Sequence, residues 1–165
     1  NGITFEVVWC PATIWCGAVG YASNCEDEPD IGYILAKYQS SCQIEKKQTA
    51  NPLWDCAISI NYWQEGAGPR GMMFGQQVLT REQITVHDVY TMPKSLYVRV
   101  ANTAENAKAA FDKESCEVYE LFGIIKDSLG ENGYEVGTNG AQEIEMYNHS
   151  AGLAYAYVQV KCKDR

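Results

Sequence analysis

A repeated order of expected elements constrains the fold of this chain more than any single motif does. Two extended segments flank Pro11 near the N-terminus, and two similar segments flank Pro93 after the midpoint. The first pair covers residues 3–8 and 13–19, and the second pair covers residues 87–92 and 95–100. Their composition is typical of β-strands, and each proline is expected to interrupt its strand because proline cannot donate to a ladder.

Each half then continues with an amphipathic helix and further strands. Apolar residues recur at helical spacing over residues 30–42 and again from about residue 115 to residue 129. The alanine-rich residues 102–110 predict a short helical turn between them. The further strands are expected at residues 54–63 and 72–79 in the first half, and at residues 134–136, 142–147 and 153–160 in the second.

This order predicts an α+β fold built from duplicated strand–helix–strand–strand halves, at about residues 1–80 and 85–165. The halves would pair into one antiparallel sheet with the two main helices on one side. The face opposite the helices would then be left concave and available for an aromatic ligand pocket. No segment rich in proline, serine or glutamine separates the halves, so we expect a single domain over residues 1–165.

The last two expected strands place charge beside aromatic rings. Alternation puts Glu143, Glu145 and Tyr147 on one face of a hairpin strand, and Tyr155 and Tyr157 on one face of its partner. A buried carboxylate is costly unless a cation or a hydrogen-bond donor meets it. A cationic aromatic ligand would do so. The alternative is an acidic strand that faces solvent, with tyrosines present as ordinary β-formers.

Composition and charge exclude several classes of partner. A formal net charge of −8 disfavours binding to nucleic acid or to an anionic membrane. No apolar run approaches the roughly 20 residues that span a bilayer. Eleven tyrosines and four tryptophans are instead typical of half-wet surfaces such as pockets. We therefore expect a small-molecule partner, possible homodimerisation, no membrane contact and no direct contact with nucleic acid.

The cysteines and histidines do not predict a metal site. None of the seven cysteines forms a CxxC pair, and the two histidines, His87 and His149, lie far apart in the chain. The cysteines are typical of small buried residues in a reducing cytoplasm, although a disulfide framework stays open. No serine or cysteine stands in a nucleophile signature, so we expect neither a catalytic nucleophile nor a cofactor.

An ordered set of motifs resembles the GyrI-like, bacterial effector-binding domain family, which occurs in AraC-type and multidrug-sensing regulators and as free-standing proteins. Residues 89–97 (VYTMPKSLY) resemble its strand, Met-Pro, small residue, Tyr opening. The aromatic helix to Leu129 follows, and then residues 144–147 (IEMY) resemble its apolar-Glu-x-Tyr strand. Residues 156–161 (AYVQVK) resemble its closing strand. The first half resembles the family more loosely.

The resemblance implies a duplicated fold with a central aromatic pocket for small, often cationic or hydrophobic molecules. It assigns Glu145 as the counter-ion of the ligand, with Tyr147 and Tyr157 as aromatic walls. Two positions depart from the family pattern. Gln159 replaces the usual proline, and Tyr155 stands where many members have a second acid, which weakens the case for a doubly charged ligand.

The candidate ligand-binding residues are Glu145, Tyr147, Tyr157, Tyr155, Tyr97, Tyr119, Phe122, Trp15 and Trp63. Core packing is the alternative role for the aromatic members, and Glu143 is the alternative to Glu145. The predicted function is small-molecule sensing, either beside a DNA-binding domain elsewhere in the polypeptide or in a free-standing protein. Two alternatives are a small hydrolase that uses a pocket glutamate to activate water and a pure protein-interaction module.

Overall fold

The computed structural model describes residues 2–41, 49–50, 54–62, 66–83, 88–139 and 142–163. Its strands are β1 (Glu6–Cys10), β2 (Thr13–Tyr21), β3 (Asp55–Ile60), β4 (Gly71–Val78), β5 (Asp88–Met92), β6 (Ser95–Ala101), β7 (Tyr134–Val136), β8 (Glu143–Asn148) and β9 (Leu153–Cys162). Its helices are α1 (Ile31–Ser41), α2 (Ala104–Phe111) and α3 (Leu121–Leu129), with the 3-10 turns η2 (Arg81–Gln83), η3 (Val118–Glu120) and η4 (Gly130–Asn132). None of the described helices is long and apolar enough to cross a membrane.

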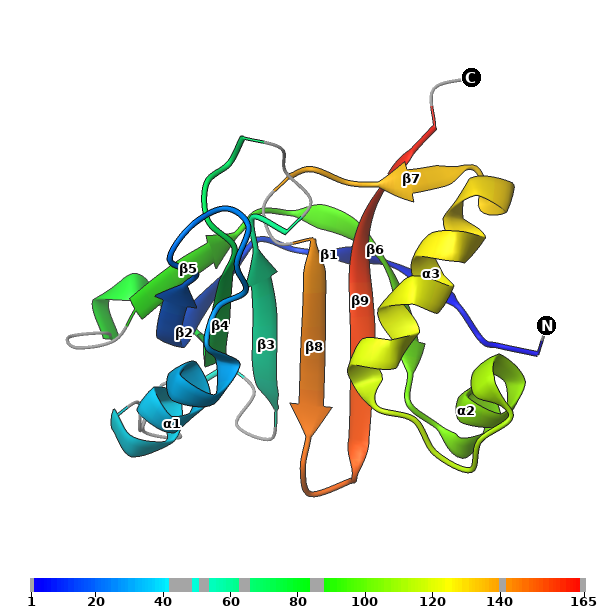
Figure 1. Cartoon of the computed structure of the whole chain (residues 1–165), viewed down its shortest axis with the longest axis horizontal. Helices are drawn as coiled ribbons and strands as arrows, with labels where there is room; N and C mark the ends of the chain where they lie inside the picture. Colours follow the sequence, from blue (N-terminus) through cyan, green and yellow to red (C-terminus); the bar gives the residue numbers. More distant parts are fainter. Residues whose placement is uncertain are drawn as a thin grey trace.

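The strands form one antiparallel sheet, and the predicted α+β class is confirmed (Figure 1). The order across the described part of the sheet is β1-β6-β9-β8-β3-β4-β2-β5, and β7 pairs with β9 beyond the end of β8. The strands β3 and β8 therefore lie at its centre, where the first half of the chain meets the second half.

A long two-stranded ribbon joins the two ends of this strand order. Cys10 lies opposite Ser95 in the β1–β6 ladder, and Thr13 lies opposite Met92 in the β2–β5 ladder. The register therefore continues unchanged past Pro11 and Pro93. Strands β1 and β2 together form one kinked strand of the ribbon, and β5 and β6 together form the other. Because β1 and β2 stand near opposite ends of the order, this ribbon curls the sheet around its own core.

All three helices pack on the same face of the sheet. Paired residues of antiparallel strands share a face. On this face Ala18 of β2 packs against Ile34 of α1, and Ala156 of β9 packs with Ile125 of α3. In Figure 1, α1 covers one lateral half of this face and α3 covers the other half, with β3 and β8 between the two helices.

The opposite face is covered and holds a second core, so the expectation of an open concave surface there is wrong. Ile58 of β3, Met73 of β4 and Tyr97 of β6 are all 0% exposed and belong to one core cluster. The reason is the curled ribbon, which carries the side chains of Trp15 and Met92 over the central strands. The sequence pattern does not reveal this closure because it depends on pairing between distant strands.

The helices lie where the sequence predicts them, with two differences in extent. Helix α1 agrees with the expected helix over residues 30–42, of which residue 42 lies outside the described part. Helix α3 starts at Leu121, later than expected, because Glu117 is extended and caps the short turn η3 in a reciprocal pair with Glu120. The expected turn at residues 102–110 is the complete helix α2, whose first turn is capped by the Thr103 side chain.

Candidate functional site

Glu145 and Tyr147 of β8 lie on the face of the sheet that carries the helices. Glu145 is directly opposite Ala57 of β3 on one side and Ala156 of β9 on the other. These two alanines carry only a methyl group each, so no large side chain of a directly paired residue covers the carboxylate. The Tyr147 hydroxyl donates a hydrogen bond to the Glu145 carboxylate.

The surroundings of Glu145 favour its uncharged form. Burial raises the pKa of Glu145; the hydrogen bond from Tyr147 opposes this, and the nearby charges of Glu143 and Glu117 raise the pKa further. Among the described residues, no lysine or arginine forms an ion pair with Glu145. Glu143 differs in this respect, because Lys126 of α3 lies 2.8 Å from its carboxylate.

A cleft of about 290 Å³ lies beside this pair, between α1 and the central strands. We call it the central cleft; it is lined by Leu35, Tyr38, Gln39, Asp55, Cys56, Phe74, Tyr147 and His149. Tyr147 thus touches both Glu145 and the cleft. Its other neighbour is His149, whose ring is stacked on Tyr147 with 5.8 Å between the centroids and 5° between the planes.

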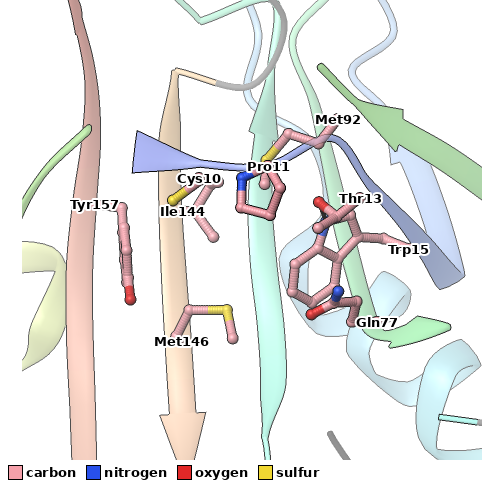
Figure 2. A pocket seen from close by; sticks show the side chains of 9 residues that line it. All are labelled: Cys10, Pro11, Thr13, Trp15, Gln77, Met92, Ile144, Met146 and Tyr157. Carbon is pink, nitrogen blue, oxygen red and sulfur yellow. Dashed lines mark hydrogen bonds between the residues drawn. The ribbon is translucent and has the colours of Figure 1, made fainter. Parts of the chain in front are cut away.

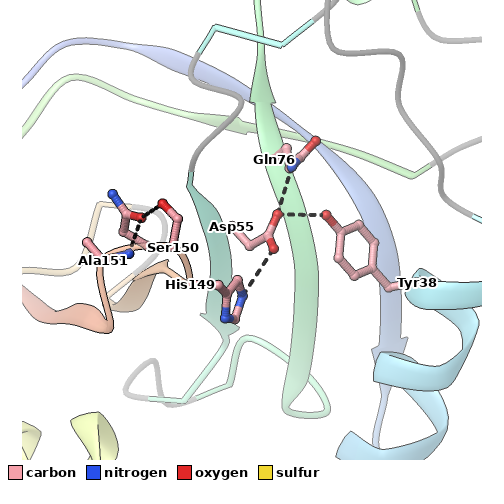
Figure 3. Close-up of polar contacts among 7 residues, drawn as sticks. Tyr38, Asp55, Gln76, His149, Ser150 and Ala151 are labelled. Carbon is pink, nitrogen blue, oxygen red and sulfur yellow. Dashed lines mark hydrogen bonds and ion pairs between the residues drawn. The ribbon is translucent and has the colours of Figure 1, made fainter.

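Asp55 organises the polar end of the central cleft (Figure 3). Its carboxylate accepts hydrogen bonds from the Tyr38 hydroxyl at 3.1 Å and from the Gln76 side-chain amide at 2.8 Å. His149 lies 3.2 Å from the other carboxylate oxygen. The Asp55 and Glu145 carboxylates therefore lie on one face, on neighbouring strands, with Tyr147 directly opposite Asp55. This arrangement is acidic and aromatic, as a cation-binding site requires.

Tyr155 and Tyr157 lie on the face opposite Glu145, so the expectation that they share one pocket with Glu145 is wrong. Tyr157 is directly opposite Ile144 of β8, and Tyr155 is directly opposite Met146. Both rings are already occupied by a cation of the chain itself. The Arg99 guanidinium lies 4.8 Å from the Tyr155 centroid and 5.8 Å from the Tyr157 centroid, and it donates a hydrogen bond to the Tyr157 hydroxyl at 3.0 Å.

An interior pocket of about 190 Å³ opens on this second face (Figure 2). It lies where β1 runs across the central strands towards β2. Its lining residues are Cys10, Pro11, Thr13, Trp15, Gln77, Met92, Ile144, Met146 and Tyr157. Two candidate residues, Trp15 and Tyr157, therefore line this interior pocket, whereas a third, Tyr97, is fully buried in the neighbouring core.

The remaining candidate ligand-binding residues line neither the central cleft nor the interior pocket, or they lie outside the described residues. Phe122 is buried in the core beneath α3, which agrees with the packing alternative. Tyr119 of η3 is 63% exposed, so it stands at the surface. Trp63 lies outside the described residues.

Sequence reasoning missed Asp55, Tyr38 and Arg99. Asp55 is the first residue of β3, and its place in the cleft depends on pairing with Tyr147, 92 positions later in the chain. The helical spacing correctly placed Tyr38 on the inner face of α1, and this spacing is the sequence feature that could have identified Tyr38 as a cleft residue. Arg99 carried no signal, because its contacts to Tyr155 and Tyr157 come from the long-range β6–β9 ladder.

Comparison with known proteins identifies the fold. No protein-family model and no curated protein sequence matches the chain. A putative bacterial transcription regulation protein from Staphylococcus aureus MU50 aligns with a TM-score of 0.63 and 15% identity, over 97% of this chain and 99% of that one. The EcmrR C-terminal domain aligns with a TM-score of 0.62 and 12% identity, over 97% and 98%.

Two further solved structures share the fold. SAV2435, determined with bound tetraphenylphosphonium, aligns with a TM-score of 0.61 and 13% identity, over 96% of this chain and 94% of that one. A hydrolase from Listeria innocua is less similar, with a TM-score of 0.51 and 10% identity over 98% and 93%. At these identities the likenesses establish the fold alone. At that level the fold that the resemblance implied is confirmed.

Proposed function

We propose that this chain is a single small-molecule-binding domain that senses a cationic aromatic ligand at the central cleft. The observation that carries the proposal is Glu145, a largely buried carboxylate with a raised pKa and no cationic partner among the described residues. A bound cation would replace the water that burial removes and would stabilise the charged form. The rings of Tyr147, Tyr38 and Phe74 around the cleft would supply cation–π and stacking contacts.

The charge and size of the site support the same ligand class. Glu117, Glu143 and Asp55 add negative charge around the site, and only Glu143 has a lysine or arginine partner within the described residues. The volume of about 290 Å³ is near the lower end for drug-sized ligands. A fold neighbour holds tetraphenylphosphonium, a permanent aromatic cation. The fold shared with a putative transcription regulation protein supports a role in regulating transcription through DNA contacts made elsewhere, or a free-standing sensing role.

Titration calorimetry with tetraphenylphosphonium tests this function, because the charge of this probe does not change with pH. We expect saturable binding to the wild type and much weaker binding of neutral triphenylphosphine oxide. Glu145→Gln should weaken binding of the cation about 10- to 100-fold, since it removes the charge and keeps the shape. Glu135→Gln is the matched control, because this exposed glutamate on β7 pairs with Lys161 and makes the same change in net charge.

Three results would contradict the proposal. If Glu145→Gln and Glu135→Gln bind the cation as the wild type does, the carboxylate is not the counter-ion. If the neutral phosphine oxide binds as tightly as the cation, the site recognises rings and not charge. A fully inert wild type would also reject cation sensing for this class of probe.

Hydrolysis is a second candidate, favoured by one specific observation. A carboxylate whose pKa is raised by burial is also what a general base needs at neutral pH. In this role Glu145 would take a proton from a water molecule that attacks an activated electrophile in the cleft. Turnover of such substrates that is lost in Glu145→Gln, without saturable binding of cations, would favour hydrolysis over sensing.

A further inference from the structure

The interior pocket and the central cleft lie on opposite faces of the same strand. Along β8, Ile144 and Met146 face the interior pocket, whereas Glu145 and Tyr147 face the helices. The sheet itself therefore separates the two spaces. A molecule in the interior pocket would not contact the Glu145 carboxylate.

The lining of the interior pocket is apolar and rich in sulfur and aromatic groups. Trp15 and Tyr157 stand on two sides, and the thioethers of Met92 and Met146 lie between them (Figure 2). Methionine packs favourably against aromatic rings and adapts to their shape. The polar group of Trp15 is already satisfied, because its indole N–H donates to the Thr13 hydroxyl at 2.9 Å.

Electrostatics on this face disfavour a cation. Arg99 bonds to the Tyr157 hydroxyl and lies over the Tyr157 ring, so the cation–π capacity of that wall is used. Its charge also reaches the Cys10 thiol, which lines the pocket. Burial raises the pKa of this thiol, and the charge of Arg99 opposes the rise. Arg99 is itself neutralised by an ion pair with Glu6 at 2.5 Å. An occupant therefore gains little from a positive charge, and none of the described residues that line the pocket is an aspartate or a glutamate.

We propose that the interior pocket is a second ligand site, selective for a neutral aromatic molecule of one or two fused rings. Its volume of about 190 Å³ supports this size. An apolar protein cavity of about 150 Å³ holds one benzene molecule. The site is distinct from the proposed cation site in its face, its charge and its lining, and it stands if that proposal fails.

Indole is the probe, and the methionine methyl groups are the reporters. The chain has four methionines, so carbon-13 labelling of their methyl groups gives a spectrum in which each can be assigned. Met92 and Met146 line the interior pocket, whereas Met72 packs near α1 on the helix-bearing face. Indole should shift the Met92 and Met146 signals through its ring current, leave Met72 unchanged, and saturate at a dissociation constant of about 1 mM or below.

Three variants separate this site from its alternatives. Cys10→Phe places a ring in the lining of the pocket and should weaken indole binding at least about tenfold. Cys25→Phe is the matched control, because Cys25 is exposed in a loop outside the pocket and should leave binding unchanged. Glu145→Gln should also leave indole binding unchanged. Tryptamine, which adds an ammonium group to indole, should shift the two reporters at least about tenfold less at equal concentration.

The wild-type spectra decide the question even if Cys10→Phe fails to fold. Absence of any shift at Met92 and Met146 up to saturating indole would overturn the site. So would shifts centred on Met72, or loss of indole binding in Glu145→Gln, because both would place the molecule in the central cleft. Equal binding of tryptamine would overturn the selectivity for neutral molecules.

Discussion

The affinity for tetraphenylphosphonium should fall by up to tenfold for each pH unit below the pKa of Glu145, until it reaches the affinity of the uncharged Glu145→Gln variant, because the charged carboxylate binds the cation more tightly than its protonated form does. The probe carries the same charge at every pH, so the change must come from the protein. Burial and the neighbouring Glu143 and Glu117 charges raise this pKa above the ordinary 4.5 of a glutamate. The decline should therefore begin at a higher pH than for a solvated carboxylate.

Calorimetric titrations across the acidic range measure this decline directly. The Glu145→Gln variant should bind weakly with little change over the same range, since an amide does not titrate there. Lys126 already pairs with the Glu143 carboxylate, so Glu143 is the weaker candidate for the counter-ion of the ligand. A wild-type profile that stays flat down to pH 4.5 would mean that another group carries the charge.

The same group predicts the effect of pH on stability. Because folding raises the pKa of Glu145, the group stabilises the folded protein below the unfolded-state pKa, and this contribution is lost as the pH rises through the folded-state pKa. At neutral pH the unliganded protein therefore bears the cost of a buried charge. Glu145→Gln should raise the midpoint of thermal unfolding at pH 7, and this gain should shrink as the pH falls towards 4.5.

The strands and their alternation could be predicted from the sequence, but the faces of the hairpin could not be matched. Glu145 and Tyr147 do share a face, as the two-residue period requires. Whether that face also carries Tyr157 depends on the register between β8 and β9. A shift of one residue moves every side chain to the other face. The pairing of Glu145 with Ala156 puts Tyr157 on the opposite side.

The closure of the sheet could not be predicted from local sequence patterns either. The prolines at residues 11 and 93 indicate where the strands are interrupted. From the sequence alone, the segments on the two sides of each proline are predicted as separate strands. The continuous register from Cys10–Ser95 to Thr13–Met92 makes them one ribbon that folds over the central strands. This ribbon converts the expected open face into a core with an interior pocket, and Glu145 and Tyr147 lie on the other, helix-bearing face.

Replacing glycine by alanine should change the stability of the fold in opposite directions at Gly17 and at Gly123, and the larger change is expected at Gly17. Gly17 of β2 is paired with Gly75 of β4, a residue whose presence weakens the strand prediction for residues 72–79. A β-carbon at Gly17 would lie 1.8 Å from the Phe74 carbonyl oxygen, and one at Gly75 would lie 2.4 Å from the Cys16 carbonyl oxygen. Both obstacles are backbone atoms, which cannot turn aside as a flexible side chain does.

Gly17→Ala should therefore destabilise the protein by on the order of 3 kcal/mol or more, because the β2–β4 ladder must separate to accept the methyl group. Gly123→Ala is the matched control. Gly123 is an exposed residue of α3 with no heavy atom within 4 Å of an added β-carbon, so alanine should stabilise the helix by about 0.5–1 kcal/mol. Urea unfolding followed by tryptophan fluorescence compares the two variants with the wild type.

The sign of each change tests the fold that positions both sites. Gly17 lies on the same face as Trp15, next to the interior pocket, and its strand also carries Ala18 beneath α1. A ladder that opens at Gly17 would loosen the contacts on both faces, so Gly17→Ala should weaken indole and tetraphenylphosphonium together. If Gly17→Ala unfolds at the same urea concentration as the wild type, β2 and β4 do not approach as closely as described, and the shape of the curled sheet must differ there.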